Sequence, residues 1–158
     1  MNKRVVITGL GVVSPNGVGL TAFTHAIKNG ICGIKHDSEL ERLQFSCQIA
    51  GKPDVSNELA LQYFSELELR NFNSSGILYG VIAGIDAWKD ADLTLEIKEE
   101  PDWDSGTIFG TGTSGIEKFR ESIYKIDDFQ TRRLGSTVVA QTMNSGISAY
   151  LAGKLGLG

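Results

Sequence analysis

Four side chains of this 158-residue chain could take part in nucleophilic catalysis, two cysteines and two histidines. A cysteine attacks as its thiolate, which a helix amino-terminus or a neighbouring base stabilises. His25 lies in a segment with helical spacing, and His36 lies in the loop that follows it. A histidine without a paired nucleophile rarely catalyses. We therefore predict that both histidines are surface residues.

The two cysteines occupy different kinds of segment. Cys32 follows the first expected helix, whereas Cys47 lies within a stretch of alternating apolar and polar residues. Unpaired cysteines are among the most buried residue types, so we predict that Cys47 is a small buried hydrophobe and Cys32 is slightly more exposed. Two cysteines cannot form a disulfide framework, and this pair lacks the spacing of a metal site. Free thiols are expected, with no metal and no cofactor.

A glycine pair, Gly9 and Gly11, follows a β-branched run. Glycines in such a place let a pyrophosphate approach a helix amino-terminus in dinucleotide-binding domains. The pattern departs from that motif because Ser14 stands where a third glycine is needed and Pro15 interrupts the helix. No acidic residue clearly ends a second strand about 20 residues further on, where a ribose would be recognised. A dinucleotide-binding oxidoreductase domain is a remote alternative.

A second glycine-rich stretch runs from Gly110 to Gly115 and leads into an expected helix that begins near Ile116. Ser114 lies in this stretch, but its neighbours do not have the Gly-x-Ser-x-Gly spacing of a hydrolase nucleophile. Thr113 suits a tight turn. On residue chemistry alone, this stretch is therefore a turn and not a hydrolase site.

The strands that would hold these glycine-rich stretches are expected at two apolar runs. Residues 4–8 and 105–110 predict strands that are covered on both faces. Residues 45–51 alternate large apolar and polar side chains and predict a half-buried strand. Because strands alternate with helices, the sequence favours an α/β domain with a largely parallel sheet. We expect the strands over 4–8 and 105–110 to lie side by side in that sheet.

Helical spacing is strongest over residues 74–91, which predicts a long helix with a broad apolar face. Its expected core positions are Ile77, Leu78, Val81, Ile82, Ile85 and Trp88. Thr21 is a candidate cap for an earlier helix that ends at Asn29-Gly30. Residues 127–134 suggest a short surface helix, and the charged residues 96–104 suggest a loop. Residues 142–155 predict a helix rich in small side chains, to which another backbone can pack closely.

Composition and charge narrow the classes of partner. The formal net charge is −4 and no cluster of Lys and Arg occurs, so nucleic acid and anionic membranes are not expected as partners. No apolar run approaches the roughly 20 residues of a membrane span, and the first residues do not resemble a signal peptide. With 41% apolar and 22% charged residues, the chain is typical of a globular domain, and we expect it in the cytoplasm.

Five stretches, in the same order and spacing, resemble the β-ketoacyl-acyl-carrier-protein synthases, which are condensing enzymes of the thiolase-like superfamily. The residues that carry the resemblance are Val5 to Gly17, Phe23 to Ile34, Tyr79 to Leu93, Gly110 to Gly115 and Asn144 to Gly158. Together they cover essentially the whole chain. The resemblance implies a layered α-β-α-β-α fold built from two related halves, of which residues 1–158 would form most of the first half only.

The resemblance also implies an activity. Members of the family transfer an acyl chain to a cysteine and, with two histidines, condense it with malonyl-acyl-carrier protein by a decarboxylative Claisen reaction. This lengthens fatty-acid or polyketide-type chains. The implied partners are acyl carrier protein, acyl and malonyl thioesters, and a second subunit in a homodimer or a heterodimer.

The family's catalytic residues have no counterpart in this chain. Its cysteine follows the stretch that resembles residues 155–158, so we expect the domain over 1–158 to end just before the nucleophile. Cys32 and Cys47 match neither that position nor its surroundings, and the chain alone is expected to be inactive. A non-catalytic partner subunit of the chain-length-factor type is the alternative.

One substrate-binding residue is implied. Thr113 stands where relatives often carry a bulkier apolar residue that lines the acyl tunnel, so it is a candidate acyl-pocket residue. Asn73 and Ser74 replace charged residues that the family usually has at the start of the long helix. Both departures leave room for a divergent paralogue.

Overall fold

A long helix forms the centre of the computed structural model, which describes residues 4–95 and 100–158. Helix α5 (Ser75–Asp90) confirms the prediction over residues 74–91 to within one residue at each end. Its predicted core positions are buried or partly buried in the main apolar cluster. The fully enclosed ones are Ile77, Val81, Ile82 and Ile85.

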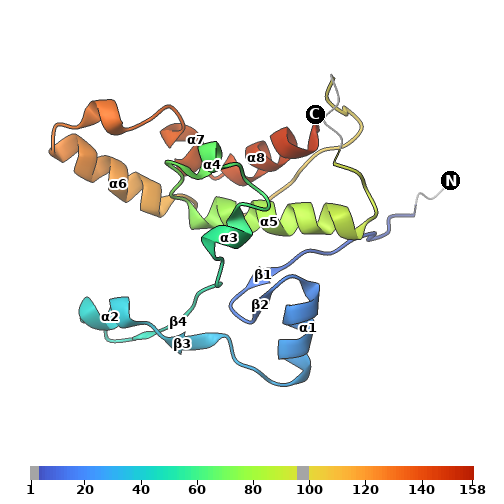
Figure 1. Cartoon of the computed structure of the whole chain (residues 1–158), viewed down its shortest axis with the longest axis horizontal. Helices are drawn as coiled ribbons and strands as arrows, with labels where there is room; N and C mark the ends of the chain where they lie inside the picture. Colours follow the sequence, from blue (N-terminus) through green and yellow to red (C-terminus); the bar gives the residue numbers. More distant parts are fainter. Residues whose placement is uncertain (1–3, 96–99) are drawn as a thin grey trace.

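Helix α8 (Gly146–Leu155) packs along α5, and the two ribbons run side by side in Figure 1. The close approach depends on glycines of α5. A Cβ atom on Gly80 would lie 2.5 Å from Ile147, and one on Gly84 would lie 2.4 Å from Leu151. Because residue numbers rise together along the contact, the two helices are parallel. The glycines of α5 thus lie opposite large side chains of α8, whereas Gly146 of α8 lies opposite Ile77 and Gly153 faces open space.

The segment between these helices differs from the prediction at its end. Helix α6 (Ile116–Asp127) begins where it was expected. The expected surface helix over 127–134 is a short 3₁₀ turn, η1 (Thr131–Arg133). The helix predicted from residue 142 begins four residues later, because α7 (Val138–Thr142) ends first and Met143 has an extended conformation.

The two strands predicted over residues 4–8 and 105–110 do not form. Neither segment belongs to a strand of the described residues, and Val5 and Ile108 are 96% and 98% exposed. The expectation that they lie side by side in one sheet is not met among the described residues, where both segments instead line the same groove. A strand forms only where a neighbouring strand takes up its backbone hydrogen bonds, and the sheets of the described residues include neither segment.

Two small antiparallel hairpins are the sheets of the described residues. The first pairs β1 (Val13–Ser14) with β2 (Gly17–Val18). The second pairs β3 (Ile34–His36) with β4 (Ile49–Gly51), so the strand predicted over 45–51 is shorter than expected. Its apolar face is not covered, since Ile49 is 58% exposed.

Four short helices complete the described chain (Figure 1). Their bounds are α1 (Leu20–Lys28), α2 (Ser38–Arg42), α3 (Asn57–Ala60) and α4 (Glu66–Leu69). Helix α1 ends at Asn29-Gly30 as predicted, with Gly30 at φ 63°, but its cap is Gly19 and not Thr21. The hydroxyl of Tyr63, after α3, donates a 2.7 Å hydrogen bond to Asp86 on α5. Burial, helped by this carboxylate, raises the pKa of Tyr63 to about 12.

Part of the predicted loop over 96–104 lies outside the described residues, namely 96–99. Within 4–95 and 100–158, none of the helices has the length and apolar character that a membrane crossing requires.

Candidate functional site

A groove of about 470 Å³ lies over helices α5 and α8. Residues 8–11 contribute one side of it and residues 106–109 the other. Its lining is mainly apolar and includes Ala83, Ala87, Leu151, Leu155 and Phe109. A surface of this kind suits an apolar polypeptide segment or an acyl chain better than a charged ligand.

Gly9 and Gly11 bring the first side of the groove against α5. A Cβ atom on Gly9 would lie 2.2 Å from the carbonyl oxygen of Ala87, and one on Gly11 would lie 1.9 Å from that of Ala83. These glycines therefore allow a strand-like segment to approach a helix closely. The chain then enters the β1–β2 hairpin and not a helix, so this region lacks the strand–turn–helix geometry of a dinucleotide site.

The second glycine-rich stretch joins the other side of the groove to α6. Gly115 has φ 63°, and a Cβ atom there would lie 1.8 Å from the carbonyl oxygen of Gln141. The hydroxyl of Thr111 donates a 2.8 Å hydrogen bond to the carbonyl of Thr113. The side chain of Thr113 is exposed and does not line the groove, so its predicted contact with an acyl chain stays a prediction.

Ser114 is buried, with 7% of its surface exposed, and its hydroxyl has no hydrogen-bond partner among the described residues. It packs near Gly76 at the start of α5. The prediction that it is not a hydrolase nucleophile rests on the spacing of its sequence neighbours and stays a prediction.

A polar cluster holds α6 and α7 against the residues that precede α5. Lys118 is 1% exposed, and its ammonium group donates to the carbonyl of Asn71 at 2.8 Å and to Glu121 at 3.3 Å. Gln141, also 1% exposed, accepts a 2.8 Å hydrogen bond from the backbone N–H of Asn73. Since Gly115 touches Gln141, this cluster also fixes the glycine-rich turn.

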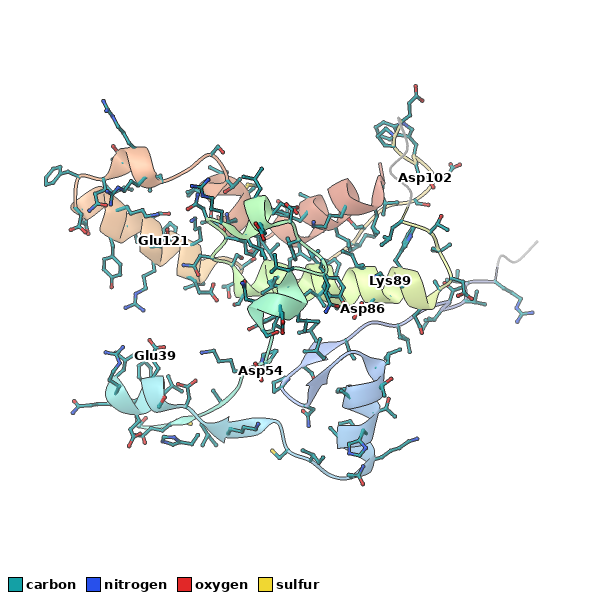
Figure 2. All side chains as sticks on the ribbon, viewed as in Figure 1. Glu39, Asp54, Asp86, Lys89, Asp102 and Glu121 are labelled. Carbon is teal, nitrogen blue, oxygen red and sulfur yellow. The ribbon has the colours of Figure 1, made fainter. Side chains whose placement is uncertain are left out.

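Glu121 is the carboxylate of the polar cluster, and Figure 2 labels it on α6. Its hydrogen bonds with Lys125 and with the side-chain amide of Asn73, together with the charge of Lys118, lower its pKa from 4.5 to about 2. The carboxylate is thus ionised throughout the neutral range, and it compensates the charge of the buried Lys118. Asn73, one of the departures from the family pattern, takes part in the cluster.

The sulfur and imidazole groups lie away from the groove lining. Both cysteines are free and exposed, so the prediction of a buried Cys47 is wrong. The reason is that the β3–β4 hairpin has no covering layer among the described residues. His25 and His36 are exposed as predicted, and His36 lies 3.5 Å from Glu41. Residues 4–95 and 100–158 contain no group of three or more acidic, histidine or cysteine side chains that could hold a metal.

Sequence reasoning did not find the groove or the polar cluster. The Gly-x-Gly spacing after residue 8 could have indicated close packing on a helix, because alternate residues of an extended segment face the same side. Lys118 offered no such signal, since a lysine in the charged sequence of α6 usually lies in solvent.

A sequence profile described as "Beta-ketoacyl synthase, N-terminal domain" matches residues 2–158. The chain belongs to the β-ketoacyl synthase family. Among curated proteins, it is 31% identical over 155 residues to 3-oxoacyl-[acyl-carrier-protein] synthase 1 of Buchnera aphidicola subsp. Schizaphis graminum. It is 30% identical over 155 residues to 3-oxoacyl-[acyl-carrier-protein] synthase 2 of Vibrio cholerae. These matches cover 95% and 98% of this chain but only 36% of each relative.

Solved β-ketoacyl synthase structures have the same fold. The crystal structure of a β-ketoacyl synthase from Burkholderia phymatum aligns with a TM-score of 0.73 at 20% identity, over 99% of this chain and 38% of that one. The ishigamide ketosynthase/chain length factor gives the same four values. A type II PKS ketosynthase in complex with its acyl-carrier protein aligns at 0.70 and 24% identity, over 99% of this chain and 36% of that one. The predicted thiolase-like α/β fold class is therefore confirmed for this part of the fold.

Proposed function

We propose that this chain forms the amino-terminal part of a β-ketoacyl-acyl-carrier-protein synthase that lengthens acyl chains by decarboxylative Claisen condensation. The match of the family's N-terminal profile to residues 2–158 carries this proposal. The chain spans little more than a third of the relatives' length. The proposal places the condensing residues in the part of the relatives that this chain does not cover. In this proposal the chain contributes a scaffold, which consists of the α5–α8 pair with its groove and the turn over residues 110–115.

The remaining chemistry of the proposal follows from the family. The acyl donor would be an acyl chain on carrier protein, and the extender would be malonyl-carrier protein, in fatty-acid or polyketide-type synthesis. We infer a cytoplasmic location and a dimer with an identical or a related subunit. The turn over 110–115 would lie beside the acyl chain, with Thr113 as a lining residue.

The alternative is a non-catalytic subunit that shapes chain length in a partner ketosynthase. The observation that supports this second function is the structural alignment with the ishigamide ketosynthase/chain length factor. The two functions differ in whether a thioester forms on the completed protein, so they can be separated by one assay.

The assay follows acyl transfer by mass spectrometry. The chain is incubated with acyl-carrier protein and malonyl-carrier protein, alone and together with a polypeptide that supplies the part of the Buchnera aphidicola synthase beyond the matched stretch. We expect no acylation of the chain alone, and a 3-oxoacyl product with release of CO₂ from the pair. Acylation of Cys32 or Cys47 in the chain alone would overturn the proposal. A pair without product that alters the product length of an active ketosynthase would establish the alternative.

A further inference from the structure

We propose that helix α5 binds a buried water molecule at its amino-terminus, between the hydroxyl groups of Ser74 and Ser114. The site lies where the starts of α5 and α6 meet in Figure 1. It joins the glycine-rich turn over 110–115 to the central helix. Because the site lies outside the groove and uses none of the chemistry of the proposed function, it can be tested independently of that function.

Both hydroxyl groups are buried without a partner. Ser74 is 2% exposed and Ser114 is 7% exposed, and neither side-chain oxygen makes a hydrogen bond within the described residues. The oxygen of Ser114 lies 3.6 Å from the position that a Cβ atom on Gly76 would take, so it faces the first turn of α5. Buried hydroxyls are normally paired with protein or with an internal water, because an unpaired one costs free energy. Since outside solvent reaches neither oxygen, the partner must be small enough to lie inside the chain.

The first turn of α5 supplies hydrogen-bond donors to the same place. The backbone N–H groups of residues 75–77 have no acceptor among the described residues, and the helix pattern begins with the bond from Leu78 to the carbonyl of Ser74. Ser74 is the N-cap residue, but its hydroxyl accepts none of these N–H groups. By contrast, Ser56 and Ser65 cap α3 and α4 directly, at 3.1 Å and 3.3 Å. At α5, both the donors and the hydroxyl that should accept from them are left unpaired.

One water molecule satisfies this set of groups. An internal water typically makes about three hydrogen bonds to polar groups that the protein leaves unpaired. Its oxygen accepts from a backbone N–H of the first turn, and its two hydrogens are donated to the oxygens of Ser74 and Ser114. The water thus acts as the cap of α5 and links residue 114 to the helix.

The charge beside the site favours a neutral ligand over an anion. A helix amino-terminus attracts anions through its unpaired N–H groups and its dipole. Here a carboxylate already lies at the first turn, because the hydroxyl of Ser75 donates a hydrogen bond to Glu117. A chloride ion would be repelled by this carboxylate, whereas a water molecule is not. Water also supplies the two donors that the serine oxygens need, which an anion lacks.

Oxygen-17 magnetic relaxation dispersion detects internal water with a long residence time, and it tests the site in the 158-residue chain. We expect Ser74→Ala and Ser114→Ala, each alone and combined, to lower the dispersion amplitude by the contribution of one water molecule. Ser122→Ala is the matched control. Ser122 is also 7% exposed, but its hydroxyl donates to the carbonyl of Lys118 at 2.7 Å, so the amplitude should not change. An unchanged amplitude in the folded Ser74 and Ser114 variants, or an equal loss in Ser122→Ala, would overturn the inference.

The sign of the stability change is a second test. With a bound water, Ser114→Ala removes one of its partners, so the equilibrium constant for unfolding should rise roughly fivefold or more. Without one, removal of an unpaired buried hydroxyl should leave that constant equal or lower it. Urea denaturation at equal ionic strength, with and without chloride, measures both variant and wild type. A constant that does not rise in Ser114→Ala would contradict the site, and a wild-type chain stabilised by chloride would identify an anion in place of water.

Discussion

Helix α5 and the segment over residues 4–8 are both apolar, yet the side chains of the helix are buried and those of the segment are exposed. Ile77, Val81 and Ile82 have no exposed surface, whereas Val5 is 96% exposed. The helix satisfies its own backbone hydrogen bonds, and α8 and the surrounding core residues cover its apolar face. A parallel strand needs partners for its backbone as well as for its side chains. The comparison shows that an apolar sequence indicates a segment suited to a buried position. Whether the segment is buried depends on the presence of a second segment that packs against it.

Cavity formation in the core should give the largest effect. Ile82→Ala removes an enclosed side chain, and we expect it to lower the free energy of unfolding by about 2–5 kcal/mol. Ile108→Ala, at an exposed position, should change it by less than about 0.5 kcal/mol. Urea denaturation followed by the fluorescence of half-buried Trp88 measures both. Similar losses in the two variants would mean that residues 105–110 are packed in solution.

Two glycine substitutions compare a backbone position packed against α5 with a backbone position that faces open space. Gly11→Ala places a Cβ 1.9 Å from the carbonyl oxygen of Ala83, so the segment must move away from α5. We expect a loss of about 1–3 kcal/mol. Gly110→Ala meets no atom within 4 Å and should be nearly neutral. The thermal midpoints of the two variants check this, and a neutral Gly11→Ala would contradict the packing of residues 9–11 on α5.

The polar cluster should make stability depend on pH. The pKa of Glu121 is lowered from 4.5 to about 2, so its contribution is complete above pH 4.5 and is lost as the pH falls towards 2. Glu121→Gln should cost about 1–2 kcal/mol at pH 7, because charge-assisted hydrogen bonds are lost. The difference from wild type should shrink over that acidic range in urea titrations. A constant difference from pH 7 to pH 2 would exclude this role for the carboxylate.

A partly exposed ion pair should have the smallest effect. The ammonium nitrogen of Lys154 on α8 lies 2.8 Å from a carboxylate oxygen of Glu68 on α4. Burial raises the pKa of Glu68, but the hydrogen bonds from Lys154 and Ser65 outweigh it and lower the pKa. Glu68→Gln should cost about 0.5 kcal/mol, and added salt should reduce the loss. Denaturation at low and high ionic strength measures it. A loss above that of Glu121→Gln would show that α4 depends on this contact more than its exposure suggests.

The elements that could be predicted from sequence are those with local causes. The helix over 74–91 follows from spacing within its own residues, and the stop at Asn29-Gly30 follows from the conformation of Gly30. The strands over 4–8 and 105–110 could not be predicted in their observed state, because burial depends on polypeptide outside them. Cys47 was misplaced for the same reason. The burial of Lys118 depends on Asn71 and Glu121, which no local pattern connects to it.

Hydrogen exchange of the chain alone tests the central comparison most directly. The account predicts that amides of Val81 to Ile85 in α5 are strongly protected, while those of residues 5–8 and 106–109 exchange at nearly the rate of an unfolded peptide. Equal protection of these two segments and α5 would contradict the account, because it would mean that they already have strand partners within these 158 residues.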